Sequence, residues 1–120
     1  MNKLTIVGNL TADPVLKTVT VGGNEVKVAN FTVAVNEKYG QTAKTTFFKV
    51  HAWRGLGETC AEYLKKGRKV LIEGPVRLNS YKDNTGAYRY DLEVRGDAVE
   101  FLDKKPEEEE DDDFAPEFEE

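Results

Sequence analysis

Residues 54–69, RGLGETCAEYLKKGRK, decide how the rest of the chain is interpreted. The apolar residues of this segment recur at the spacing i, i+4, i+7 and i+8, which marks one face of an α-helix: Leu56, Cys60, Tyr63 and Leu64. We expect Gly67 to cap the C-terminus of this helix. Lys65 and Lys66 are expected in its last turn, where cations interact favourably with the helix dipole.

Strand patterns flank this helix on both sides. Alternating or β-branched runs bounded by turn residues predict strands at 3–10, 15–21, 26–38 and 45–53 before the helix, and at 69–76 after it. Residues 77–81 and 88–94 flank the turn signal KDNTG and predict a long hairpin. Residues 36–46, NEKYGQTAKTT, are expected to form a loop.

A single short helix between two halves of a small antiparallel sheet favours a closed barrel, because an open sheet would leave unpaired edges. The commonest barrel of this plan is the OB-fold. The predicted fold class is therefore all-β, a five-stranded Greek-key OB-fold barrel with one short helix.

Charge is divided unevenly along the 120 residues. Residues 1–105 hold 17 Lys and Arg against 12 Asp and Glu, a net charge of +5, whereas residues 106–120 hold 10 acids and no base. We therefore expect a domain at 1–105 suited to a polyanion, followed by a disordered acidic tail at 106–120. The tail either meets a basic partner, competes with the polyanion, or only keeps the protein soluble.

Several other classes of protein are disfavoured. The N-terminus has no basic leader, no apolar run is long enough to span a membrane, and one Cys excludes an intrachain disulfide. A lone His51 and a lone Cys60 are better read as a surface histidine and a small core residue than as a catalytic pair. Metal-ligand clusters and a phosphate-binding loop are absent from the sequence, so no metal, catalytic residue or cofactor is expected.

The strand at 45–53 carries the strongest functional signal. Thr46, Phe48, Val50 and Ala52 form an ordinary core face, whereas the opposite face alternates aromatic and basic residues: Phe47, Lys49, His51 and Trp53. Bases stack on aromatic rings and phosphates attract cations, so such a face suits single-stranded nucleic acid. The hairpin repeats this composition with Arg77, Tyr81, Lys82, Tyr88, Arg89 and Tyr90, and the expected loop adds Lys38, Tyr39 and Lys44.

Three stretches resemble the bacterial single-stranded DNA-binding proteins: NKLTIVGNLTADPVLK, TTFFKVHAWRGLGETCAEYLKKGRKVLIEGPVR and GDAVEFLDKK, which together extend from residue 2 to residue 105. The resemblance implies an OB-fold that assembles as a homotetramer, with DNA wrapped around it and bases stacked on aromatic residues.

Position by position, the resemblance implies base stacking by Tyr39, Phe47, Trp53 and Tyr81. It implies phosphate contacts by Lys3, Lys49, Lys66 and Arg77, to which we add Lys44, Arg54, Lys82 and Arg89. Three aromatic positions that are often Trp in the family are Tyr or Phe here, and Ser80 stands where a basic residue is common.

The tail resembles the acidic tip with which this family recruits replication and repair proteins, although the long linker that usually precedes the tip is nearly absent. Its candidate partner-binding residues are Asp111, Asp112, Asp113, Phe114, Pro116 and Phe118. The tip also differs in that Phe118 is followed by Glu119 and Glu120.

The sequence thus predicts a non-enzymatic, sequence-independent binder of single-stranded DNA that protects it in replication, recombination and repair, in the cytoplasm and associated with the nucleoid. One alternative is an OB-fold replication adaptor, similar to primosome accessory proteins, that works mainly through protein contacts. A second, weaker alternative is a small hydrolase on a β-barrel.

Overall fold

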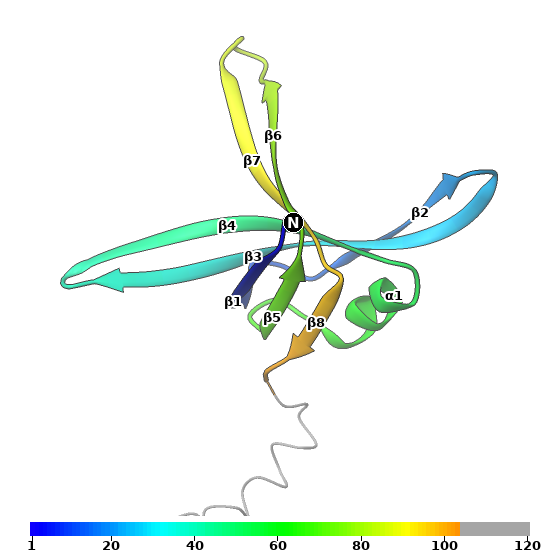
Figure 1. Cartoon of the computed structure of the whole chain (residues 1–120), viewed down its shortest axis with the longest axis horizontal. Coiled ribbons are helices and arrows are strands. Elements are labelled where there is room, and N and C mark those ends of the chain that lie inside the picture. The colour runs from blue at the N-terminus through cyan, green and yellow to red at the C-terminus, as the bar shows by residue number, and fades with distance from the viewer. Residues whose placement is uncertain (104–120) are drawn as a thin grey trace, which may run out of the picture.

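The computed structural model describes residues 1–103, drawn in colour in Figure 1. Eight strands and one helix follow each other in this part of the chain: β1 (Leu4–Leu10), β2 (Val15–Val21), β3 (Asn24–Tyr39), β4 (Thr42–Trp53), α1 (Arg54–Tyr63), β5 (Lys69–Gly74), β6 (Val76–Lys82), β7 (Tyr88–Arg95) and β8 (Ala98–Phe101). The expected tail, 106–120, lies outside the described residues.

The strands form one sheet in the order β6-β7-β4-β3-β1-β5-β8, with β2 paired to β3. Within residues 1–103 the pair β4–β7 is parallel, and every other strand pair is antiparallel. The sheet closes where β7 leaves β4 and meets β5: the Arg95 N–H donates to the Pro75 carbonyl at 3.1 Å, and the Asp97 N–H donates to the Glu73 carbonyl at 2.9 Å. A side chain at Gly74 would collide with the Arg95 carbonyl oxygen, so this closure requires glycine.

Five of the strands line the core, and this confirms the five-stranded barrel. β1, β3, β4, β5 and β7 supply its buried strand residues, including Leu10, Val33, Val50, Ile72 and Val94. Helix α1 and the residue after it cover one end of the barrel with Cys60 and Leu64. The barrel is therefore filled by side chains and leaves its outer surface for binding.

The C-terminal end of the helix differs from the prediction. Helix α1 ends at Tyr63, and Leu64 is extended (φ −93°, ψ 148°), so Lys65 and Lys66 lie beyond the helix and Gly67 does not cap it. Leu64 turns into the core, where it is only 3% exposed. Gly67 instead adopts a φ of 89° and donates its N–H to the Leu10 carbonyl at 2.9 Å. The burial of Leu64 and the hydrogen bond from Gly67 to β1 therefore take the place of the additional helical turn that the sequence predicted.

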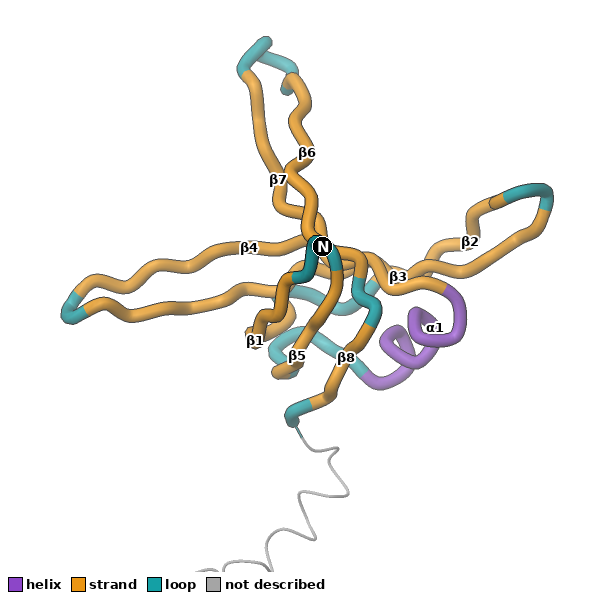
Figure 2. Tube along the Cα trace, viewed as in Figure 1, coloured by secondary structure: helices purple, strands orange, loops and turns teal. Residues whose placement is uncertain are grey.

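Three hairpins, which we call arms, extend from the barrel: β2–β3, β3–β4 and β6–β7 (Figure 2). The expected loop at 36–46 is wrong, because β3 and β4 continue as a paired ribbon up to a turn at Gly40 and Gln41. Gly40 has a φ of 64°, which suits a tight hairpin turn, and the β-branched Thr42, Thr45 and Thr46 favour strand. The arms give a radius of gyration of 17.0 Å, against about 13 Å for a compact domain of this length.

Among residues 1–103, none of the helical structure is long and apolar enough to cross a membrane.

Candidate nucleic-acid interface

Strands β6, β7, β4 and β3 present a continuous surface on the side of the sheet opposite the core, which we call the outer face. Cross-strand pairing places on it Phe47, Lys49, His51 and Trp53 of β4, Arg89, Asp91, Glu93 and Arg95 of β7, and Arg77, Asn79 and Tyr81 of β6. Thr46, Phe48, Val50 and Ala52 alternate with the β4 residues and face the core. The two predicted faces of 45–53 are therefore confirmed.

Three aromatic side chains of the outer face are accessible to a ligand. Phe47 is 58% exposed, Tyr81 is 44% exposed and Trp53 is 38% exposed. A ring on a sheet surface that has no partner above it can stack against a nucleic-acid base. The outer face thus brings together exposed aromatic rings from β4 and β6, two strands whose aromatic residues lie more than 25 residues apart in sequence.

Two carboxylates on β7 also lie on the outer face, and the sequence analysis did not anticipate their position. The Lys49 ammonium is 2.9 Å from an Asp91 carboxylate oxygen, and this hydrogen bond raises the pKa of Lys49. His51 Nδ1 is 2.6 Å from the Asn30 amide oxygen, and its Nε2 is 3.7 Å from a Glu93 carboxylate oxygen. A bound phosphate would have to compete with Asp91 for Lys49.

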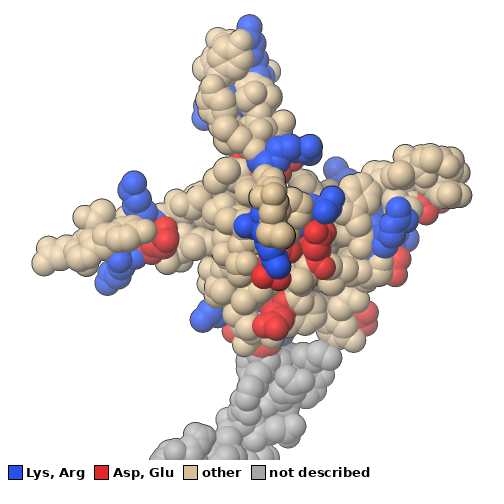
Figure 3. All heavy atoms as spheres, viewed as in Figure 1, with Lys and Arg blue, Asp and Glu red and all other residues tan. Residues whose placement is uncertain are grey.

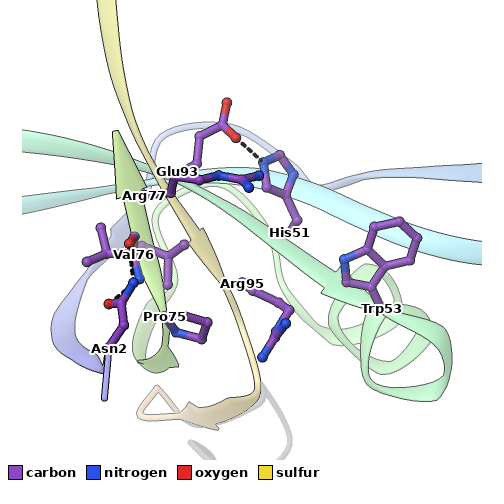
Figure 4. Close-up of a pocket in the computed structure, with 9 residues that line it drawn as sticks. Asn2, His51, Trp53, Pro75, Val76, Arg77, Glu93 and Arg95 are labelled. Carbon is purple, nitrogen blue, oxygen red and sulfur yellow. Dashed lines mark hydrogen bonds and ion pairs between the residues drawn. The ribbon is translucent and has the colours of Figure 1, made fainter. Parts of the chain in front are cut away.

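A pocket of about 330 Å³ opens where the β6–β7 arm joins the barrel (Figure 4). Its lining combines the Trp53 indole with several polar side chains, which are Asn2, His51, Arg77, Glu93 and Arg95. Asn2 holds the start of β6, because its side chain donates to the Val76 carbonyl at 2.7 Å and accepts from the Val76 N–H at 3.1 Å.

Three of these pocket residues, Asn2, Glu93 and Arg95, were not identified in the sequence analysis. The alternation of charged residues along β7 is a signal that could have identified Arg95.

Other predicted residues lie on the opposite face of the arms. Tyr39 pairs with Thr42, and Lys44 pairs with Glu37, so both alternate away from Phe47 near the tip of the β3–β4 arm. Tyr39 is 60% exposed. Lys82 and Tyr88 likewise alternate away from Tyr81, and the Lys82 ammonium lies 5.4 Å from the centre of the Tyr88 ring. The structure therefore does not bring Tyr39, Lys44 or Lys82 onto the outer face.

The remaining basic candidates are distributed around the barrel, and Figure 3 shows Lys and Arg on the arms and around their junction. Arg54 follows Trp53 directly and begins α1. Lys3 is 3.6 Å from Glu73, and Arg89 is 2.9 Å from Asp83. Lys66 donates its backbone N–H to Asp13, which lies beyond the Leu10 end of β1. The pocket opens at the other end of β1, near Leu4, and the length of the strand separates the two ends by about 20 Å.

The possible nucleophile does not face this surface. Cys60 is fully buried in the core, and burial raises the pKa of its thiol to about 11. The thiol therefore remains protonated near neutral pH, which makes it a poor nucleophile. This matches the interpretation of Cys60 as a small core residue.

The tail residues proposed as partner contacts, Asp111 to Asp113, Phe114, Pro116 and Phe118, lie outside the described residues.

Comparison with known proteins matches residues 1–102 to the single-strand binding protein family. A single-stranded DNA-binding protein of Caldanaerobacter subterraneus subsp. tengcongensis is 38% identical over 132 aligned positions, which cover 99% of this chain and 86% of that protein. Single-stranded DNA-binding protein 1 of Clostridium acetobutylicum is 36% identical, with 89% of this chain and 98% of that protein covered.

The range matched by the family model, residues 1–102, contains the barrel, the three arms and the outer face. The chain therefore belongs to the single-strand binding protein family.

Proposed function

We propose that this protein binds single-stranded DNA without sequence preference, by stacking bases on the aromatic rings of the outer face and contacting phosphates with the basic side chains around them. Family membership makes it a single-stranded DNA-binding protein and not an enzyme. The observation that carries the stacking mechanism is the exposure of Phe47, Trp53 and Tyr81 on one continuous sheet surface with Lys49 and Arg77.

The proposed DNA-binding residues fall into groups according to their position on the barrel and its arms. Phe47, Trp53 and Tyr81 are the proposed stacking residues of the outer face, and Tyr39 is a fourth on the opposite side of the β3–β4 arm. Lys49, Arg77 and Arg89 contact phosphates beside them, with Arg54 next to Trp53. Lys3, Lys44, Lys66 and Lys82 lie farther away and contact a strand that continues around the barrel. The DNA-binding unit is residues 1–105.

A direct test compares single-stranded and duplex DNA. Stacking requires unpaired bases, and the apolar residues of α1 cover the barrel, so the helix is not available to enter a major groove. Labelled oligothymidine should bind much more tightly than a blunt duplex of equal length in the same salt, measured by fluorescence anisotropy. Equal affinities would refute the proposal.

Self-association is part of the proposal, with a homotetramer as the expected state and a dimer as the fallback. Val7 is 41% exposed on β1 and is available for an interface, whereas Phe48 is half-buried against the core. The arms also expose apolar side chains, including Val15, Leu78 and Tyr90. Symmetric assembly would cover such surfaces. A monomer in sedimentation at micromolar concentration would contradict it.

A cellular role follows from DNA binding. We place the protein in the cytoplasm on the nucleoid, where it would protect single strands during replication, recombination and repair. The acidic segment 106–120 would recruit replication and repair proteins, with Phe114 and Phe118 as apolar anchors. Tail-dependent pull-down of such a protein with a basic surface would support this, and identical binding by a chain lacking 106–120 would contradict it.

The adaptor alternative has one specific observation in its favour. Asp91 pairs with Lys49 and Glu93 faces His51, so part of the positive charge on the outer face is already neutralised. A face with mixed charge and aromatic rings also suits a protein partner. The anisotropy experiment separates the two functions, because an adaptor would bind oligothymidine weakly.

A further inference from the structure

We propose that Arg95 contacts a DNA phosphate at the junction of two nucleotide-sized pockets that share Trp53. This inference rests on the proposed binding of single-stranded DNA. It assigns a phosphate contact to a residue of β7, whereas the alternation of aromatic and basic residues that indicated DNA binding lies on β4. One pocket is the 330 Å³ pocket at the base of the β6–β7 arm. The other, of about 670 Å³, opens toward the start of α1.

Trp53 and Arg95 line both pockets. Both volumes fall in the range of about 300–1,000 Å³ that small-molecule sites occupy. A base can therefore stack against the exposed indole from either pocket. The phosphate that links two successive nucleotides would then lie close to Arg95, which Figure 4 shows between Pro75 and Trp53.

The Arg95 side chain is held ready for such a contact. Its Nε donates to one Asp97 carboxylate oxygen at 2.8 Å, and its Nη2 donates to the other at 3.2 Å. A guanidinium has five N–H donors, so this bidentate pair leaves three for a ligand. The side chain is 61% exposed, so a ligand can reach it. Fixing the guanidinium plane in advance lowers the entropy lost when a phosphate binds.

The backbone beneath Arg95 is also fixed. Its N–H donates to the Pro75 carbonyl at 3.1 Å, where the barrel closes, and the residue pairs in register with His51 of β4. Arg95 thus stands on a rigid strand end and not on a mobile loop. This rigidity favours a defined contact over diffuse electrostatic attraction.

The second pocket has the composition expected of a nucleotide site. Val21 and Leu56 supply apolar surface, and Arg54 and Arg95 outweigh Asp97, leaving one net positive charge. Arg54 has a φ of 60°, and no other non-glycine residue within 1–103 has a positive φ. Such a conformation is unfavourable for a residue with a side chain, and retained strain is concentrated at functional positions.

The test compares Arg95→Gln with Lys27→Gln, which removes the same charge elsewhere. Lys27 lies on the β2–β3 arm, where it pairs with Thr18. The next residue, Val28, is the cross-strand neighbour of Trp53, so Lys27 lies on the opposite face of the arm from Trp53. Oligothymidine binding is followed by anisotropy and by quenching of Trp53 over a range of salt. We expect Arg95→Gln to weaken binding about tenfold, the size of a lost charge-assisted hydrogen bond. Its log–log salt slope should become shallower by about 0.7, the value for one phosphate on a single strand.

A conservative variant separates contact from charge. Arg95→Lys keeps the charge and loses the planar fork, so it should bind more weakly than the wild type and more tightly than Arg95→Gln. Thermal unfolding of each variant checks that the barrel remains folded. If Arg95→Gln is unfolded, the affinity of Arg95→Lys for oligothymidine alone tests the assignment.

Equal affinities and salt slopes for Arg95→Gln and Lys27→Gln, or a fully wild-type Arg95→Lys, would overturn the assignment. Failure of the wild type itself to bind oligothymidine would instead refute the proposed function.

Discussion

Trp53 joins the two pockets and is the single tryptophan of the chain, so its emission reports on one site. We predict that oligothymidine quenches it strongly. Trp53→Ala should weaken binding by about 1–3 kcal/mol, the usual contribution of one stacked base, and Trp53→Phe should lose less because it keeps a ring. Unchanged emission at saturating DNA would show that no base stacks there.

Arg54 provides a second prediction at the scale of one residue. A left-handed backbone costs a residue with a side chain about 1–2 kcal/mol, and replacing that residue with glycine removes this cost. Glycine also loses more conformational entropy than other residues when it is fixed in a helix, which offsets part of the gain in stability. Arg54→Gly should therefore raise the free energy of unfolding, by up to about 1 kcal/mol, while weakening DNA binding through the lost charge.

Arg54→Ala is the matched control, because it loses the charge and keeps the strain. Urea unfolding and anisotropy on both variants separate the two effects. Equal stabilities of the two variants would show that the backbone at residue 54 is unstrained.

At the scale of elements, two glycines show how helix α1 packs on the barrel. A methyl group at Gly57 would overlap the Ala52 carbonyl oxygen and lie 3.1 Å from the Ala29 backbone nitrogen, whereas a methyl group at Gly55 meets no atom within 4 Å. Gly57→Ala should destabilise the protein by about 1–3 kcal/mol, typical of overpacking. Gly55→Ala should stabilise it by about 0.5–1 kcal/mol, because alanine is the better helix former. Thermal melts of the two variants should shift in opposite directions, and a shared direction would contradict this packing.

The tip of the β6–β7 arm depends on Asp83. Its Oδ1 accepts hydrogen bonds from the Thr85 hydroxyl at 2.6 Å, the Thr85 N–H at 2.9 Å and the Ala87 N–H at 3.1 Å, and its Oδ2 accepts from Arg89 at 2.9 Å. The Thr85 hydroxyl, followed by Arg89, lowers the pKa of Asp83 from 3.8 to about 2. Because the folded pKa is depressed, the turn keeps this stabilisation above pH 3.8 and loses it as the pH falls through 2.

Amide exchange measured by NMR should therefore show faster exchange at Thr85 and Ala87 as the pH falls between these values, after correction for intrinsic rates. Asp83→Asn removes the titrating group, so this transition should disappear from the variant. A transition that persists in Asp83→Asn would assign it to another carboxyl group.

At the scale of the whole molecule, the balance of charge sets affinity. The chain has a net charge of −5, and removal of 106–120 leaves +5. Ten carboxylates follow Lys105 in the sequence. Because they are tethered to the barrel, we expect them to reach a high effective concentration at its basic residues and to compete with phosphates. Truncation at residue 105 should therefore tighten DNA binding at low salt. The ratio of truncated to full-length affinity should approach one as the Debye length falls below about 10 Å, above 0.1 M salt.

Titrations of both chains across salt test this competition. A ratio near one at every salt concentration would mean that the tail acts only on partners. Weaker binding after truncation would mean that the tail supports the DNA-binding assembly.

The sequence alone determined the barrel, the single helix, the β6–β7 hairpin and the two faces of 45–53. These features depend on local periodicity, because a period of two or 3.6 decides which side chains a strand or helix buries. The family resemblance carried by residues 2–105 was likewise readable, and comparison over 1–102 confirmed it.

Only the tertiary structure decided which faces meet. The parallel pairing of β4 with β7 brings Asp91, Glu93 and Arg95 beside Lys49, His51 and Trp53. Strand β7 then leaves β4 and meets the end of β5, which closes the barrel at Gly74. The continuous pairing of β3 with β4 places Tyr39 on the face opposite Phe47. Helix α1 ends at Tyr63, and Leu64 turns into the core. The β4–β7 pairs join residues more than 40 positions apart, and the energy of these contacts comes from long-range pairing and burial, which local propensity does not encode.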